Sequence, residues 1–202
     1  RRQRQMCIRD SRWVRVVDYK TGSKKLDLKE VYCGLDCQML LYLFTLERNG
    51  GHLFSQGTAA GVEYLWADPA PENIIRPETD DAEPSQAQNY PLEGLLLDEP
   101  SIYHAMDTRG TGAFVPLSFS AKTGEPTAQS AKARLADREK FNRIRDHLDG
   151  MLTDMAKNLY SGEIDAAPLV PNAGKSPCLW CEYRTVCRHA DGEGERTPLK
   201  PC

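Results

Sequence analysis

WVRVVDYKTG, at residues 13–22, is the stretch that decides the fold of this 202-residue chain. Its first residues are mostly β-branched or aromatic, and the threonine and glycine at its end are typical of a turn, so it predicts a β-strand. Side chains alternate across a strand, so Val16 shares one face with Asp18 and Lys20. That face is apolar and becomes ionic at its end. The pattern predicts a carboxylate and an ammonium side by side at the rim of a sheet.

Asp18 and Lys20 fit the chemistry of a metal-dependent phosphodiesterase. A carboxylate can hold Mg²⁺, which keeps several of its waters and takes few protein ligands. Lys20 could orient the attacking water or neutralise charge on the phosphoryl group in the transition state. The pattern D-x-K is also common as an ordinary ion pair at a strand end, and these two residues alone leave that alternative open.

The segment after this strand has a helical pattern and adds two candidate site residues. Asp27 begins a pattern that resembles a capping box, and residues 49–51 form a strong helix stop. Gln38 and Tyr42 are i, i+4 neighbours and are expected to project together. Four apolar residues at helical spacing are expected to face the core: Leu35, Met39, Leu43 and Leu46.

The rest of the chain predicts further elements. Residues 61–66 alternate as a second strand would, and this strand is expected to lie parallel to the first. Residues 92–97 and 101–106 are interpreted as two short helices. Residues 130–160 carry the longest helical pattern, and Gly150 is its expected break.

The composition is that of a globular domain. Hydrophobic residues make up 40% of the chain, enough for a core. The net charge of −3 does not by itself indicate a nucleic-acid binder, although basic residues outnumber acidic ones within residues 122–145. A DNA phosphate track could use that stretch, but a solvated helix face is the simpler interpretation. The sequence has neither a run of about 18 apolar residues nor a signal-peptide pattern, so the cytoplasm is the expected location and no membrane contact is predicted.

Three of the seven cysteines lie close together, in PCLWCEYRTVC at residues 177–187. Cys178, Cys181 and Cys187 have the spacing C-x2-C-x5-C, and their thiolates would suit zinc or an iron-sulfur cluster. A fourth ligand is not obvious, because His189 follows too closely for a comfortable site. Two other cysteines, Cys33 and Cys37, are expected to be small core residues. His104 and His147 lie among apolar neighbours and are interpreted as structural.

The motifs together carry a family resemblance. D-Y-K-T-G at residues 18–22, followed by G-L-x-x-Q-x-x-x-Y at residues 34–42, resembles the last two motifs of the RecB-type branch of the PD-(D/E)XK nuclease superfamily. With G-L-L-L-x-x-P at residues 94–100 and the terminal cysteine pattern, the chain resembles the C-terminal nuclease domain of the AddB family. AddB proteins are the second subunits of bacterial AddAB helicase-nucleases.

The resemblance implies an α/β fold of restriction-endonuclease type: a mixed sheet flanked by helices, truncated at its N-terminal end, with a C-terminal iron-sulfur cysteine loop. The expected domains are a partial nuclease domain over residues 13–174, the cysteine motif over residues 175–191 and a flexible tail over residues 192–202. Residues 1–12 resemble translated sequencing-adapter read-through. They are expected to be a non-native leader, so Cys7 and Asp10 carry little weight.

The resemblance also implies roles for individual residues. Asp18 would hold Mg²⁺ with help from the Tyr19 backbone carbonyl, and Lys20 would position water. Gln38 and Tyr42 would align the DNA strand or the lysine, with all four side chains converging on one cleft. Cys178, Cys181 and Cys187 would bind a 4Fe-4S cluster whose fourth cysteine lies outside this fragment.

The implied function is Mg²⁺-dependent exonuclease cleavage of one DNA strand during double-strand break resection and recombinational repair, in a heterodimer with an AddA-like subunit. The family's first metal-binding acid has no match here, and G-x-x-x-x-G-K-(S/T), the ATP-binding motif, does not occur. The chain alone is therefore expected to cleave DNA poorly. The alternatives are a Cas4-like iron-sulfur exonuclease and a catalytically inactive, zinc-clipped DNA-binding scaffold.

Overall fold

The structure is a computed structural model, and it describes residues 13–22, 24–50, 57–67, 92–170, 176–187 and 189. The chain divides into two compact units. The first comprises Arg1–Leu26 and Met39–Phe141, and the second comprises Asp27–Gln38 and Asn142–Cys202. The sheet and the strand that carries Asp18 belong to the first unit.

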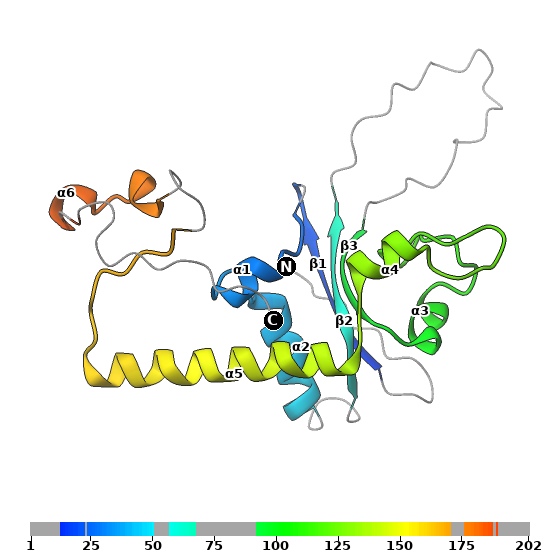
Figure 1. Ribbon diagram of the computed structural model, residues 1–202, viewed down its shortest axis with the longest axis horizontal. Coiled ribbons are helices and arrows are strands. Elements are labelled where there is room, and N and C mark those ends of the chain that lie inside the picture. The colour runs from blue at the N-terminus through cyan, green and yellow to red at the C-terminus, as the bar shows by residue number, and fades with distance from the viewer. Residues whose placement is uncertain are drawn as a thin grey trace, which may run out of the picture. The chain divides into compact units, whose positions relative to one another are not determined.

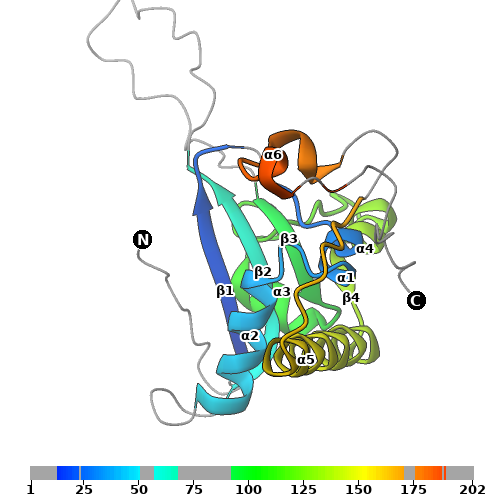
Figure 2. The same ribbon diagram turned by 90° about the vertical axis from the view of Figure 1, so that its left-hand side faces the viewer.

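The first unit is built on a mixed sheet with the strand order β1-β2-β3-β4. Its strands are β1 (Trp13–Lys20), β2 (Thr58–Trp66), β3 (Leu92–Leu97) and the two-residue β4 (Leu135–Ala136). β1 and β2 are parallel, β2 and β3 are antiparallel, and β3 and β4 are parallel. Figures 1 and 2 show β1, β2 and β3 side by side in this order. Both strands predicted at the start of the chain, and the mixed sheet itself, are confirmed.

A register shift in β2 decides which side chains meet across the sheet. Val14 pairs with Ala59, but the next residue of β1 pairs with Gly61, so Ala60 is an extra residue in β2. Beyond this shift Asp18 pairs with Tyr64, which in turn pairs with Glu93 on β3. Paired residues project to the same side of a sheet. Asp18, Tyr64 and Glu93 therefore form one row on one face.

The contact between β2 and β3 requires glycine. A Cβ atom on Gly94 would lie 2.1 Å from the carbonyl oxygen of Val62, and a Cβ atom on Gly61 would lie 2.5 Å from that of Leu95. Both distances are far inside van der Waals contact with backbone atoms, which cannot move aside as a flexible side chain can. The two strands thus approach each other as closely as they do because these positions have no side chain.

Helix α2 (Gln38–Asn49) lies against the sheet in the view of Figure 2 and buries Met39, Leu40, Leu43 and Phe44. The Glu47 carboxylate accepts a hydrogen bond of 2.8 Å from the Ala59 amide, which joins α2 to β2. Leu35 was expected in the buried stripe, and this prediction is wrong, since its side chain is exposed. The reason is that α1 (Leu28–Tyr32) ends before it and Asp36 has a φ of 54°, so Leu35 lies in a turn between two helices.

Residues 92–97 form strand β3, so their interpretation as a helix is wrong. A short apolar run fits a buried strand as well as a buried helix, because neither leaves a polar face to reveal its period. Residues 101–106 lie within helix α3 (Pro100–Met106), as predicted.

The long helical pattern at residues 130–160 is divided between α4 (Ala128–Arg134) and α5 (Arg138–Ser161), with β4 between them. Asp137 accepts a 2.7 Å hydrogen bond from the Lys140 amide, so it starts a second helix. The predicted break at Gly150 is wrong: Figure 1 shows α5 as one uninterrupted helix. It ends before Gly162, whose φ of 75° is the left-handed conformation common after a helix.

The second unit contains α1, most of α5, the 3-10 helix η2 (Pro177–Trp180) and α6 (Arg184–Cys187). Asp27 caps α1 by accepting a hydrogen bond of 2.8 Å from the Lys29 amide. A ring nitrogen of His147 lies 3.1 Å from the Tyr32 carbonyl oxygen, and the two rings are in contact. His147 therefore has the packed environment of a structural histidine. None of the described helices is both long enough and apolar enough to cross a membrane.

Substituting Gly94 with alanine should destabilise the protein, because the new methyl group would press on the β2 backbone. We expect the free energy of unfolding to fall by about 1–3 kcal/mol, as for other overpacked sites. Gly150→Ala is the matched control, because a Cβ atom there meets nothing within 4 Å. That change should raise stability by up to about 1 kcal/mol, from helix propensity alone. Urea unfolding followed by circular dichroism measures both values, and equal effects would contradict the close approach at Gly94.

Candidate active site

The candidate site is centred on the carboxyl end of β1. Asp18 is buried at 9% exposure, and the Lys20 Nζ atom lies 2.6 Å from its Oδ2 atom. The sequence predicted that these side chains would meet at the rim of the sheet, and the contact confirms it. A carboxylate and an ammonium held this close can share the same water or phosphate oxygen.

Tyr64 forms the wall behind the pair. Its side chain is 2% exposed, and the Lys20 Nζ atom lies 5.5 Å from the centre of its ring. An aromatic face attracts a cation at this distance. Lys20 is thus held between a carboxylate and an aromatic ring, which limits its rotamers before any substrate arrives. The D-Y-K motif gave no indication of Tyr64, because its position depends on the register of a strand more than forty residues away in sequence.

A second ion pair lies on the opposite face of the same two strands. The Arg15 Nη1 atom lies 2.7 Å from Glu63 Oε2 and donates to the Phe114 carbonyl oxygen at 3.0 Å. Glu63 is 1% exposed. Burial raises the pKa of Glu63 to about 7, and the charge and hydrogen bond of Arg15 oppose that rise only in part. The pair ties β1 to β2 and to the segment that follows α3.

Two motif residues remain as predicted roles only. Tyr42 is 39% exposed, and it projects from α2 away from that helix's buried stripe. Gln38 is exposed at the start of α2 and belongs to the second unit, whereas Asp18 belongs to the first. The convergence of Gln38 and Tyr42 on Asp18 therefore stays a prediction.

The residues around Asp18 fit Mg²⁺ only as an ion shared with substrate. In the described part of the chain, no three His, Cys, Asp or Glu side chains are grouped so as to hold a metal ion. Mg²⁺ does not need such a cage, because one or two carboxylates, several waters and a substrate phosphate satisfy it. Asp18, with the backbone carbonyl of the exposed Tyr19 next to it, can supply the protein's share of such a site.

The C-terminal cysteines lie in consecutive turns of the second unit. Cys178 is in η2, the Cys181 amide donates to the Cys178 carbonyl oxygen at 3.4 Å, and Cys187 ends α6. All three are free thiols, and Cys181 and Cys187 are exposed. They have the donor chemistry of an iron-sulfur site, but as arranged here they do not form one of the metal-holding groups sought among the described residues. The cluster remains a prediction from spacing and resemblance.

The two cysteines of the α1–α2 region behave differently from those three. Cys37 is buried and its thiol lies 3.6 Å from the Val31 carbonyl oxygen. Burial, together with the charge of Asp36, raises the pKa of Cys37 to about 11. A thiol that stays protonated is a poor ligand and a poor nucleophile. Cys37 is a core residue, as predicted, while Cys33 is half-buried.

Asp107 is a buried acid that the sequence associated with the G-L-L-L-x-x-P segment. Its carboxylate accepts hydrogen bonds from the Gly112 amide at 2.6 Å, the Ala113 amide at 3.1 Å and the Thr111 hydroxyl. Although burial acts to raise the pKa of Asp107, these donors together hold it below its ordinary value. Asp107 therefore organises the loop after α3.

Comparisons with known proteins agree with this geometry. The profile of the PD-(D/E)XK nuclease superfamily matches residues 6–188. The chain is also similar to proteins named as the B subunit of an ATP-dependent helicase/deoxyribonuclease: it is 30% identical to that of Exiguobacterium sibiricum over 191 residues, 33% to that of Symbiobacterium thermophilum over 186 and 29% to that of a Thermoanaerobacter species over 183. These alignments cover 91%, 89% and 87% of this chain but only 16%, 15% and 15% of the relatives.

Glu63 should make stability depend on pH. Its pKa is raised from 4.5 in the unfolded chain to about 7 in the folded protein. The folded protein thus binds this proton more tightly. The resulting stability is fully present below pH 4.5 and is lost as pH rises through about 7. We expect the difference in unfolding free energy between the wild type and Glu63→Gln to shift by roughly 3 kcal/mol, against the wild type, from pH 4 to pH 8.5.

Urea denaturation of both proteins at several pH values measures this difference, and subtracting the variant removes the contribution of every other titrating group. A difference that does not change with pH would contradict the prediction. It would mean that Arg15 keeps the Glu63 carboxylate ionised throughout.

Proposed function

Because this chain belongs to the PD-(D/E)XK nuclease superfamily, we propose that it hydrolyses one strand of DNA in a Mg²⁺-dependent exonuclease reaction. The observation that carries the proposal is the contact between Asp18 and Lys20 at the end of a strand of a mixed sheet. The similarity to helicase/deoxyribonuclease B subunits supports DNA as the substrate. It also supports a heterodimer with an AddA-like helicase-nuclease subunit, acting in double-strand break resection and recombinational repair.

In the proposed reaction, Asp18 and the Tyr19 backbone carbonyl hold Mg²⁺, which would supply Lewis-acid activation of the scissile phosphate. Lys20 orients the attacking water and offsets negative charge on the phosphoryl oxygens as the transition state forms. The Tyr64 ring keeps the ammonium at the rim, so little reorganisation is needed. Gln38 and Tyr42 align the DNA strand or Lys20.

A second candidate function is a catalytically inactive DNA-binding scaffold clipped by zinc. It is favoured by one observation: in the described part of the chain Asp18 has no second acid grouped with it as a metal site. A Cas4-like exonuclease is a third candidate, and it shares the proposed chemistry. The cysteine loop and the activity of Asp18 variants separate these candidates.

Removing either member of the Asp18–Lys20 pair should abolish cleavage. We would replace the matching segment of the E. sibiricum relative with this chain, so that the domain works within an intact protein. Asp18→Ala and Lys20→Ala should each lower Mg²⁺-dependent cleavage of single-stranded DNA by at least about 100-fold, because each removes charge stabilisation made in the transition state. DNA binding in the presence of a chelator should change little.

Lys157→Gln is the control for this experiment, since that side chain is 71% exposed on α5, far along the sequence from β1. It should leave cleavage unchanged. Robust metal-dependent cleavage that survives Asp18→Ala would overturn the assignment of β1 as the catalytic strand.

Anaerobic purification should yield a coloured protein if Cys178, Cys181 and Cys187 bind an iron-sulfur cluster, because thiolate-bound clusters absorb visible light and zinc does not. Cys181→Ser should remove the colour, whereas Cys33→Ser, in the same chain but outside the loop, should not. Iron and zinc analysis of each preparation completes the measurement. A colourless protein with bound zinc would favour the scaffold.

A further inference from the structure

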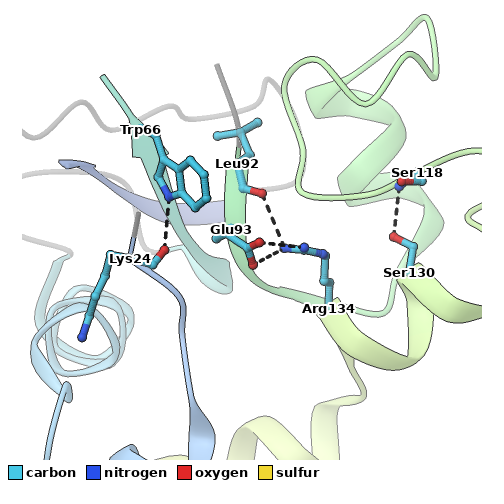
Figure 3. A network of polar contacts seen from close by, with 7 residues as sticks. All are labelled: Lys24, Trp66, Leu92, Glu93, Ser118, Ser130 and Arg134. Carbon is cyan, nitrogen blue, oxygen red and sulfur yellow. Dashed lines mark hydrogen bonds and ion pairs between the residues drawn. The ribbon is translucent and has the colours of Figure 1, made fainter. Parts of the chain in front are cut away.

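A second polar site lies across the sheet from Asp18, where α4 meets β3. The Arg134 guanidinium makes two hydrogen bonds to the Glu93 carboxylate, from Nη1 to Oε2 at 2.5 Å and from Nη2 to Oε1 at 2.9 Å. Figure 3 shows this fork beside a second contact on the same helix, in which the Ser130 Oγ atom accepts a hydrogen bond of 3.0 Å from the Ser118 amide. Ser130 and Arg134 are i, i+4 neighbours, so both project from one face of α4.

The space between these two contacts is a cavity of about 290 Å³. It is lined by Ser118, Thr127, Gln129, Ser130, Ala133 and Arg134. The Thr127 and Ser130 hydroxyls each accept a hydrogen bond from a backbone amide. A hydroxyl that accepts in this way still has its own proton to donate. The lining therefore offers hydroxyl, amide and guanidinium donors together, which is the chemistry of an anion site and not of an apolar pocket.

The strand register connects this cavity to the candidate catalytic pair. Glu93, which holds Arg134, is in the same row as Tyr64 and Asp18. Two interstrand spacings separate Glu93 from Asp18, a distance of about 10 Å along the row. A single DNA strand that crosses the sheet at its rim could place one phosphate at Asp18 and Lys20 and another beside Arg134, since single-strand sites span about 4–16 nucleotides.

The Glu93–Arg134 pair is suited to exchange. Its side chains are 19% and 27% exposed, so neither charge is sealed in the core. The planar fork of arginine fits a phosphate as well as a carboxylate. In the absence of DNA, Glu93 keeps the guanidinium in place at the cavity wall and neutralises it.

We propose that this cavity binds a backbone phosphate of the substrate strand, with the Arg134 guanidinium exchanging the Glu93 carboxylate for the phosphate and the neighbouring hydroxyls donating to it. The identity of the strand rests on the proposed function. The site itself does not depend on catalysis, so binding of DNA without a divalent metal tests it.

The experiment measures the affinity of the whole 202-residue chain for a fluorescein-labelled oligothymidylate, by anisotropy in a chelator-containing buffer at several salt concentrations. Arg134→Gln should weaken binding about 5- to 10-fold and reduce the slope of log K against log salt by about 0.7, because one phosphate contact is lost. Glu93→Gln should tighten binding, because it removes the carboxylate that competes for Arg134. A purely structural ion pair would make both variants change affinity in the same direction.

Two further variants keep the result unambiguous. Gln129→Ala removes an exposed donor from the cavity and leaves the ion pair intact, so it should weaken binding about 2- to 3-fold even if Arg134→Gln folds poorly. Lys157→Gln removes one positive charge from an exposed position on α5 and should leave affinity within about 2-fold. Thermal unfolding of each variant verifies that it is folded.

Affinity that does not respond to Arg134→Gln or Gln129→Ala, or that falls in Glu93→Gln, would overturn the inference and leave the proposed function standing. A wild-type chain that binds no oligothymidylate would overturn both. Opposite shifts in Arg134→Gln and Glu93→Gln, with the expected salt slope, would support the phosphate site.

Discussion

The register of β1 on β2 is the constraint on which the rest of the structure depends. Side chains alternate along a strand, so a slip of one residue would turn Asp18 from one face of the sheet to the other and separate it from Tyr64. The extra residue at Ala60 sets this register. Glycine at position 94 then lets β3 approach closely enough to extend the row to Glu93. The candidate catalytic pair, its aromatic wall and the polar cavity at α4 all follow from that alignment.

The buried pair of Arg15 and Glu63 has its main effect on that register. The desolvation of two charges offsets most of their attraction, so a buried ion pair adds little net stability. Removing one partner is costly, however, because the other charge is then left in an apolar environment. Arg15 reaches the Glu63 carboxylate at 2.7 Å when it is paired opposite Gly61. A shifted register would bury Arg15 or Glu63 without its partner, so the pair penalises misalignment of the catalytic strand.

The sequence predicted what depends on local pattern. It identified β1, β2, the cap at Asp27, the helix end at Gly162 and the contact of Asp18 with Lys20, because each follows from periodicity or from the conformational preference of one residue. It misassigned residues 92–97, since a fully buried strand has no polar face. It also gave no indication of Tyr64 or of the pairing of Glu93 with Arg134, whose side chains are 41 positions apart and meet only through the sheet register and the position of α4. The divided helix at Asp137 was readable as a cap but lay inside a continuous helical pattern.

The place of β1 in the strand order has a consequence for how the site can be completed. Among the described strands, β1 has β2 on one side only, so it is an edge of the sheet. An edge strand presents backbone N–H and C=O groups that can pair with an incoming strand. Any strand added there would lie directly beside Asp18, and the side chain it placed opposite Asp18 would join the same row. The same open edge exposes the chain to self-association, so β-augmentation and aggregation compete for the surface nearest the candidate metal ligand.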